Sequence, residues 1–244
     1  MMDKSFIEKM LELAGEQIVE VNGRYYSNQN LTLIREPEIK PVKLSGLKGL
    51  IDIIDAECKK LPDAVLFINT ELFINIDSET HVTVFGLLND YFRHTYYTAV
   101  PELPQIERKL NGFMPLENMI IFLMTNFIET EDRDYLIKLF SNITDEKSVK
   151  MTDDGLSQTV NAKQGIALAE KTTVKKIVTL KPYRTFLEAE QPEEKFLPRL
   201  DANGNAALFA ADGGMWKIQA KKNIRDYLHV NISDGYKNII KILD

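Results

Sequence analysis

Two neighbouring carboxylates, Asp153 and Asp154, are the residues whose type and spacing most directly suggest chemistry. Paired carboxylates can hold a divalent cation or act as general acid and base, and Glu190 could join them around a metal. The step from Asp154 to Gly155 is also common turn sequence, because these residue types tolerate the backbone conformations of turns. We interpret the pair as a turn, expect neither a metal nor another cofactor, and rank a metal-dependent enzyme last among the possible functions.

The histidines and the single cysteine do not form a metal-binding or catalytic pattern. His81, His94 and His229 lie in different predicted elements without ligand spacing, and one cysteine is too few for a cysteine-rich zinc site. Lys59 beside Cys58 could lower the pKa of the thiol, but the sequence identifies no partner base. One cysteine cannot form an intramolecular disulfide, so we expect a reducing compartment, the cytoplasm.

Cations and aromatic residues are interleaved in the C-terminal part of the chain. The whole chain has a net charge of −6, which argues against a protein that coats duplex DNA, yet basic residues outnumber acidic ones between Val160 and Leu228. Aromatic rings among cations on a sheet can stack unpaired bases while the cations neutralise phosphates. The alternative is that Phe186 and Trp216 belong to the core and that Tyr183 packs against proline. The candidate site for single-stranded nucleic acid consists of Lys181, Tyr183, Arg184, Phe186, Trp216, Lys217, Lys221 and Lys222.

The N-terminal part of the chain predicts a hairpin, a helix and a meander. Asn22-Gly23 between β-favouring residues is a strong signal for a tight hairpin, because both residues tolerate positive φ. Ser45 can cap a helix with an apolar stripe that ends near Lys59. Further β-like runs, over residues 64–69, 72–77, 81–85 and 91–100, predict an antiparallel meander.

Two helices follow and form a predicted helical hairpin that packs on the meander. Pro115 occupies a first-turn position of the first helix, whose middle is apolar on all sides and must therefore be covered on most of them. Its apolar window is much shorter than the roughly 20 residues of a membrane span, so we expect no membrane contact. The second helix covers about 131–140, with Thr130 as its cap and with acidic residues in its first turn, where negative charge favours the helix dipole.

The C-terminal part is predicted to be β-rich. Short β-favouring pieces follow residue 142, Asp201-Ala202-Asn203-Gly204 connects a hairpin, and Asp212-Gly213-Gly214 makes a turn into Met215–Ile218. A closing helix is expected over Lys221–Leu228. The fold class is therefore α+β, with antiparallel sheets, a helical hairpin and a β-rich C-terminal half. We expect an N-terminal region of residues 1–142 and a C-terminal region of residues 143–244, or one continuous domain.

Several motifs resemble an uncharacterised family of bacteriophage and prophage proteins with a domain of unknown function. The resemblance is carried by Asp-Asp-Gly-x-x-Gln-x-Val at 153–160, Leu-Lys-Pro-Tyr-Arg-Thr-Phe at 180–186, Glu-Gln-Pro at 190–192 and Ala-Leu-Phe-x-Ala-Asp-Gly-Gly-x-Trp-Lys at 207–217, and by Thr130–Arg133. It implies a phage or prophage source, and therefore the cytoplasm of a bacterial host cell, and it assigns no catalytic residue.

The functional expectation is a non-enzymatic protein that works by self-assembly or by binding a host or phage protein. Strands with exposed edges, for instance residues 91–100, could pair between subunits of a homo-oligomer. The alternative is an accessory protein of phage DNA replication or recombination that binds single strands through the basic residues named above.

Overall fold

The computed structural model describes residues 9, 12, 18–27, 40–59, 72–88, 93–144, 149–153, 158–162 and 170–243. The chain divides into two compact units, Met1–Ile39 and Lys40–Asp244. In the first unit, β1 (Ile18–Val21) and β2 (Arg24–Ser27) form the predicted hairpin. Asn22 and Gly23 have φ values of 54° and 76°, so the turn uses the left-handed conformation that these two residue types tolerate.

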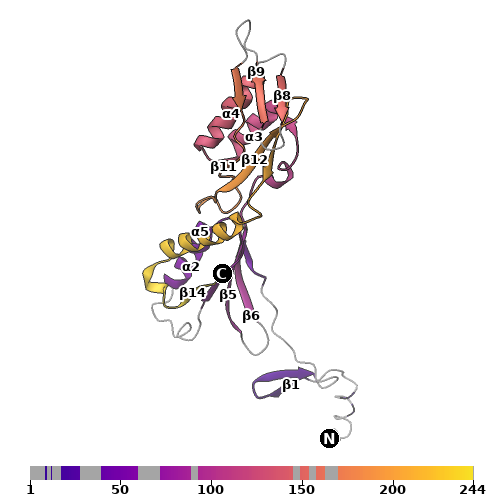
Figure 1. Ribbon diagram of the computed structural model, residues 1–244. Coiled ribbons are helices and arrows are strands. Elements are labelled where there is room, and N and C mark those ends of the chain that lie inside the picture. The colour runs from indigo at the N-terminus through magenta and orange to yellow at the C-terminus, as the bar shows by residue number, and fades with distance from the viewer. Residues whose placement is uncertain are drawn as a thin grey trace, which may run out of the picture. The chain divides into compact units, whose positions relative to one another are not determined.

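The second unit contains a five-stranded sheet that confirms the predicted meander (Figure 1). Neighbouring strands β4, β5 and β6 are antiparallel, whereas both outer strands, β14 and β3, pair in parallel with their neighbours. The sheet order is β14 (Ile240–Leu243), β4 (Leu72–Ser78), β5 (His81–Leu88), β6 (Arg93–Ala99) and β3 (Val42–Leu44). The predicted strand over 64–69 lies outside the described residues.

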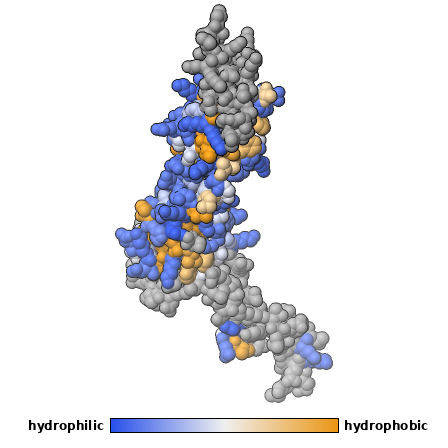
Figure 2. All heavy atoms as spheres, viewed as in Figure 1, coloured by the Kyte–Doolittle hydropathy of each residue, from blue (hydrophilic) through white to orange (hydrophobic). Residues whose placement is uncertain are grey.

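Alternating side chains of this sheet build one hydrophobic core with two helices. Ile74, Ile76, Val82 and Val84 are fully or almost fully buried, and they share a cluster with residues of α2 (Leu47–Lys59) and α5 (Trp216–Asn231). The period of two in each strand places these side chains on the same face. Figure 2 shows orange hydrophobic surface among blue hydrophilic surface near this helix-covered part of the molecule. On the other face the rings of Phe73 and Phe85 stack, with their centroids 5.5 Å apart.

The start of α2 depends on a residue far away in the sequence. The carboxylate Oε1 of Glu188 accepts a hydrogen bond from the backbone N–H of Lys48 at 3.3 Å. Glu188 therefore supplies an acceptor at the helix N-terminus, a role that the sequence suggested for Ser45. A Cβ atom on Gly46 would lie 2.2 Å from the same oxygen. Glycine at position 46 therefore lets the carboxylate approach the first turn.

A second core lies under a four-stranded sheet, and here the structure differs from the prediction for the helical hairpin. Helices α3 (Leu116–Asn126) and α4 (Glu131–Thr144) pack on this sheet and not on the meander, because Phe122, Leu136 and Phe140 share their cluster with Val178 and Phe196. The sheet order is β11 (Val178–Leu180), β12 (Glu194–Leu200), β13 (Asn205–Ala210) and β7 (Met114–Pro115). Each of the two cores thus contains residues from both sides of position 142.

The loop between α3 and α4 is fixed by hydrogen bonds from the first turn of α4. Thr130 Oγ1 accepts the N–H of Arg133 at 3.2 Å, as the predicted cap requires. The buried side chain of Arg133 donates from Nε to the carbonyl of Leu123 at 3.1 Å, near the C-terminus of α3. Arg133 therefore satisfies a carbonyl that α3 leaves without a partner in its last turn.

Three details of the helices differ from the sequence interpretation. Pro115 belongs to β7 and precedes α3, which begins at Leu116. Ile121 and Met124 of α3 are 52% and 57% exposed, so the helix is covered on one face only. Met215–Ile218 does not form a strand: α5 begins at Trp216, five residues before the predicted closing helix.

The remaining strands form a small antiparallel sheet in the order β10 (Glu170–Thr173), β9 (Gln158–Ala162) and β8 (Val149–Asp153). With helices and mostly antiparallel sheets in separate stretches of the chain, the fold class is α+β, as predicted. Among the described helices, none combines the length and the apolar character needed to cross a membrane.

Candidate functional site

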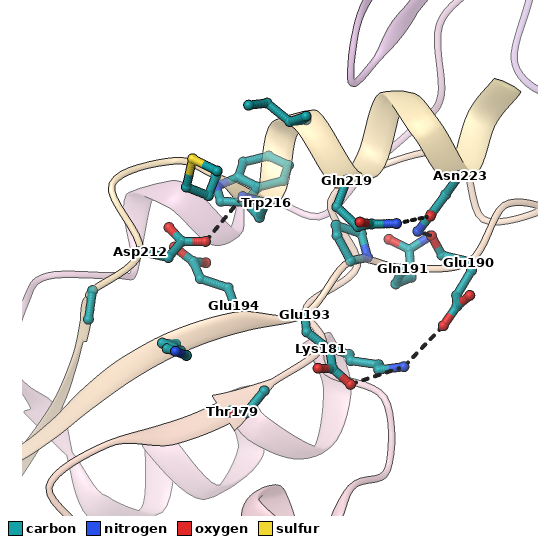
Figure 3. A pocket seen from close by; sticks show the side chains of 15 residues that line it. Thr179, Lys181, Glu190, Gln191, Glu193, Glu194, Asp212, Trp216, Gln219 and Asn223 are labelled. Atoms are coloured by element: carbon teal, nitrogen blue, oxygen red, sulfur yellow. Dashed lines mark hydrogen bonds and ion pairs between the residues drawn. The ribbon is translucent and has the colours of Figure 1, made fainter.

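A groove of about 680 Å³ lies between the first turns of α5 and the segment that leads into β12 (Figure 3). We call it the α5 groove. It is lined by Thr179, Lys181, residues 190–195, Ala211, Asp212, Met215, Trp216, Ile218, Gln219 and Asn223. In Figure 3, Trp216, Asp212 and Glu194 lie close to one another, while Lys181, Glu190 and Glu193 form a second group on the opposite wall.

The helix wall of the groove is positioned by Asp212. Its Oδ1 accepts the N–H of Gly214 at 2.9 Å, and its Oδ2 accepts the N–H of Trp216 at 3.1 Å. Gly213 and Gly214 have φ values of 67° and 87°, a conformation that favours glycine and that turns the chain sharply into the helix. The sequence Asp212-Gly213-Gly214 is therefore a helix start, where we expected a turn between strands.

Glu194 and Arg184 form a buried ion pair behind this wall. Their side chains are 2% and 4% exposed, and Arg184 Nη1 donates to Glu194 Oε2. Burial raises the pKa of Glu194 to about 7; the positive charge of Arg184 lowers it, and the neighbouring carboxyl of Asp212 raises it further. Glu194 therefore titrates near neutral pH.

The Arg184 guanidinium also connects this pair to the rest of the unit. Its Nε lies 3.1 Å from Glu107 Oε1, and its carbon atom Cζ lies 4.6 Å from the centre of the Trp216 ring. A smaller cavity of about 320 Å³ lies on that side and is lined by Arg184, Trp216, Lys217 and Glu79, among others. Its cations are paired with carboxylates, since Lys217 Nζ lies 3.2 Å from Glu79 Oε1.

The opposite wall of the groove is held by the buried amide of Gln191. Its Oε1 accepts the N–H groups of Arg184 and Thr185 at 2.9 and 3.2 Å, and its Nε2 donates to the carbonyls of Phe186 and Ala189 at 2.9 and 3.2 Å. One side chain thus closes the loop from residue 184 to residue 191. Residues 180–186 and 190–192, which carry part of the family resemblance, meet at Gln191. In this structure they shape the loop.

Charged and amide side chains form the outer edge of the groove. Lys181 Nζ lies 3.2 Å from Glu190 Oε1 and 3.5 Å from Glu193 Oε1. The hydrogen bond to Glu190 has the largest effect on the pKa of Lys181. Together the two pairs outweigh the opposing effect of burial and raise this pKa. Asn223 of α5 donates to the carbonyl of Glu190 at 2.7 Å and accepts a bond from Gln219 at 2.7 Å, which links the two walls.

The structure distributes the predicted nucleic-acid residues over different environments. Phe186 is fully buried, and Trp216 and Arg184 are 7% and 5% exposed, so these three side chains are not open to an incoming base. Tyr183 packs against the core of the four-stranded sheet. Lys181 and Lys217 are exposed in part and ion-paired, whereas Lys221 and Lys222 lie further along α5, where Lys221 is half-buried and Lys222 is exposed.

The residues of the metal hypothesis lie in different elements. Asp153 ends β8 in the three-stranded sheet, Asp154 lies outside the described residues, and Glu190 lies at the α5 groove. His81 and His229 belong to β5 and α5. Cys58 is buried in α2. Within the described part of the chain, no cluster of three or more histidine, cysteine, aspartate and glutamate side chains could hold a metal ion.

Sequence reasoning missed Glu194, Gln191, Met215 and Ile218 as members of one site. Glutamate and glutamine in a polar segment give no periodic signal of burial. For Met215 and Ile218 a signal was present at Asp212, because an aspartate followed by glycines can cap a helix as well as form a turn. With α5 begun at Trp216, Met215 is the residue that precedes the helix and Ile218 lies in its first turn, and they are 63% and 66% exposed.

No known family model, no curated protein and no solved structure matches the chain.

Proposed function

We propose that this protein acts by binding another polypeptide, without catalysing a reaction, and that the α5 groove is the binding site. The observation that carries the proposal is the exposure of Met215 and Ile218, 63% and 66%, on the rim of a groove of about 680 Å³. Exposed apolar side chains beside a concave surface are typical of sites where proteins bind partners. Trp216 lines the same wall but is almost fully buried, so Met215 and Ile218 supply the exposed apolar surface.

Hydrogen bonds within the chain hold both walls of the groove in place. Gln191 satisfies four backbone groups of one wall, Asp212 fixes the first turn of α5, and Asn223 connects the two walls at 2.7 Å. A preformed site loses little conformational entropy on binding, and this supports the assignment of the groove as a recognition surface.

The polar groups of the groove support binding over catalysis. Asp212 uses both carboxylate oxygens to accept helix N–H groups, and Glu194 is paired with a buried arginine. Lys181 is paired with two glutamates. Each of these groups has a role in holding the fold together, whereas a general acid or a nucleophile must be available to a substrate.

From the sequence we also expect self-assembly through exposed strand edges, but the five-stranded sheet supports this less than it supports binding of a different polypeptide. Residues 91–100 were predicted to offer an exposed edge, but β6 lies inside the five-stranded sheet between β5 and β3. The outer strands β3 and β14 are short and carry Lys43 and Lys241, and lysine on an edge strand disfavours pairing between molecules. We therefore propose a different polypeptide as the partner, and keep the proposal of a phage or prophage source from the resemblance.

Site-specific photo-crosslinking in cells tests the proposed function. A photoreactive amino acid at position 218 should give a crosslinked product, whereas the same group at position 230 should not. Val230 is 80% exposed on the same helix but is not part of the groove, which makes it a matched control. Mass spectrometry of the product distinguishes another polypeptide from a second copy of this chain. Equal labelling at both positions, or none at 218, would overturn the proposal.

A further inference from the structure

We infer that the partner segment in the α5 groove presents an apolar side chain next to a lysine or arginine. The inference rests on the proposed function, since it names the chemistry of the partner at the same site. The apolar side chain would contact Met215 and Ile218, and the cation would pair with Glu190 and Glu193. Both pairs of residues line one groove: Met215 and Ile218 lie at the start of α5, and Glu190 and Glu193 lie just before β12.

The apolar part of the inference follows from the first turn of α5. Met215 and Ile218 are three residues apart, so they lie on one side of the helix, next to each other. Each leaves nearly two thirds of its surface exposed, and both line the groove. An apolar side chain placed here removes water from three hydrophobic groups at once, its own and these two.

The cationic part follows from an imbalance of charge on the opposite wall. Glu190 and Glu193 place two carboxylates around the single cation of Lys181, at 3.2 and 3.5 Å. The glutamate side chains are 73% and 62% exposed, while that of Lys181 is 23% exposed. Two further charges line the groove, the carboxylate of Asp212 and the cation of Lys195. Apart from the Arg184–Glu194 pair, carboxylates therefore exceed cations by one in the groove as a whole, and this favours a partner with a positive charge.

The partner must be recognised by its side chains and not by strand addition to β11. Thr179 donates its N–H to Asp132 Oδ2 at 2.7 Å, and the carbonyl of Lys181 accepts the N–H of Ile128 at 2.9 Å. The N–H of Tyr183 is bonded to the carbonyl of Asn126 at 3.0 Å. The first turn of α4 and the loop between α3 and α4 thus already occupy backbone groups of residues 179, 181 and 183, which a strand added here would need.

Binding of three short fluorescent peptides to the intact protein tests the inference. The peptides share a leucine pair and differ only in the residues next to it, which are lysine in one, glutamine in the second and glutamate in the third. Fluorescence anisotropy at low salt should show the lysine peptide binding at least about tenfold more tightly than the glutamine peptide, with the glutamate peptide weakest. High salt should reduce the difference between them.

Three variants test which residues cause the charge preference and which cause the apolar contact. Replacing both Glu190 and Glu193 by glutamine should bring the lysine peptide to the affinity of the glutamine peptide and leave the latter unchanged. Ile218→Glu should weaken the glutamine peptide about tenfold or more, and Val230→Glu should leave every peptide unchanged. Circular dichroism checks that each variant is folded.

The outcomes separate the inference from the proposed function. If Ile218→Glu weakens binding but the lysine and glutamate peptides bind equally, the groove binds polypeptides and the inferred charge preference is wrong. The same holds if the double glutamine variant keeps the preference. If no peptide binds at millimolar concentration, or if Ile218→Glu behaves like Val230→Glu, the inference is overturned. The proposed function falls as well only when crosslinking at position 218 also fails.

Discussion

Asp132 Oδ2 accepts the backbone N–H of Thr179 at 2.7 Å and thereby joins the first turn of α4 to the outer strand of the four-stranded sheet. Oδ1 of the same carboxylate receives Lys175 Nζ at 2.7 Å. A side chain that we expected only to favour the helix dipole therefore also closes a sheet edge. Its partners are 43 and 47 residues away in the sequence, so neither contact could be predicted from local pattern.

Removal of the Asp132 carboxylate should destabilise the second unit. Asp132→Ala leaves the N–H of Thr179 and the charge of Lys175 without this acceptor, and we expect a loss of about 1–3 kcal/mol in the free energy of unfolding. Urea unfolding measures it. Glu131→Gln is the control, because Glu131 is an exposed carboxylate in the same turn. Equal effects of the two variants would contradict the assigned role.

The pH dependence of stability should reveal the same carboxylate. Although burial raises the pKa of Asp132, the hydrogen bonds from Lys175 and Thr179 and the charge of Lys175 lower it overall. A lowered pKa in the folded state means that the stabilisation is present above the ordinary pKa and is lost as pH falls through the lowered one. The difference in stability between wild type and Asp132→Asn should therefore shrink below about pH 4. A difference that stays constant down to pH 2 would argue against this account.

Glu194 should produce the opposite trend. Its pKa, raised mainly by burial to about 7, makes the folded state hold a proton that the unfolded state has already released. Stability should thus be highest below the ordinary pKa and fall by at most about 1.4 kcal/mol per pH unit as pH rises toward 7. Glu194→Gln should flatten this slope, measured as urea midpoints between pH 5 and pH 8, while the exposed Glu193→Gln should not. A slope that persists in Glu194→Gln would assign the proton to another group.

The approach of Glu188 to Gly46 makes a specific double-mutant prediction. A Cβ atom at position 46 displaces the Glu188 carboxylate, so Gly46→Ala should remove the acceptor of the Lys48 N–H and cost about 0.5–2 kcal/mol. Glu188→Ala should cost a similar amount, and the double variant should cost no more than either single one. Gly49→Ala is the control: nothing lies within 4 Å of the added atom, and it should stabilise α2 by up to about 1 kcal/mol. Additive losses at 46 and 188 would show that the two residues act independently.

Binding of single-stranded nucleic acid should be absent. The rings of Phe186 and Trp216 are buried and Lys181, Arg184 and Lys217 are ion-paired, so a labelled oligonucleotide titrated at low salt should show no saturable binding. Salt-sensitive binding that Lys221→Gln and Lys222→Gln weaken together would instead support the alternative function, because a contact to phosphates must weaken as salt rises.

Local patterns predicted most of the elements and little of their arrangement. Asn22-Gly23, Thr130 and Asp201-Ala202-Asn203-Gly204 each determine a turn or a cap within a few residues, and the structure has each of these features. The choice of sheet that α3 and α4 cover depends instead on which apolar faces fit together. The alternation in β12 and β11 is as regular as that in β4 and β5, so the pattern could not decide between the two sheets.

The groove was harder to predict, because its residues are ordinary in sequence. Gln191 is a polar residue next to proline, yet it is 3% exposed and bonds to four backbone groups. Glu194 opens a β-strand and becomes buried only because Arg184 reaches it from a loop. Such pairings are decided by tertiary structure, and no spacing rule relates their positions.

The place of α5 and β14 in the fold has a consequence for synthesis on the ribosome. Helix α2 and strands β4 to β6 are made early, but the second helix that covers their apolar face and the strand that flanks β4 come from residues 216–243. Until those residues have emerged, the growing polypeptide must carry the face that includes Ile74 and Val84 only partly covered. Nascent chains stalled before residue 216 should therefore recruit chaperones that full-length chains release.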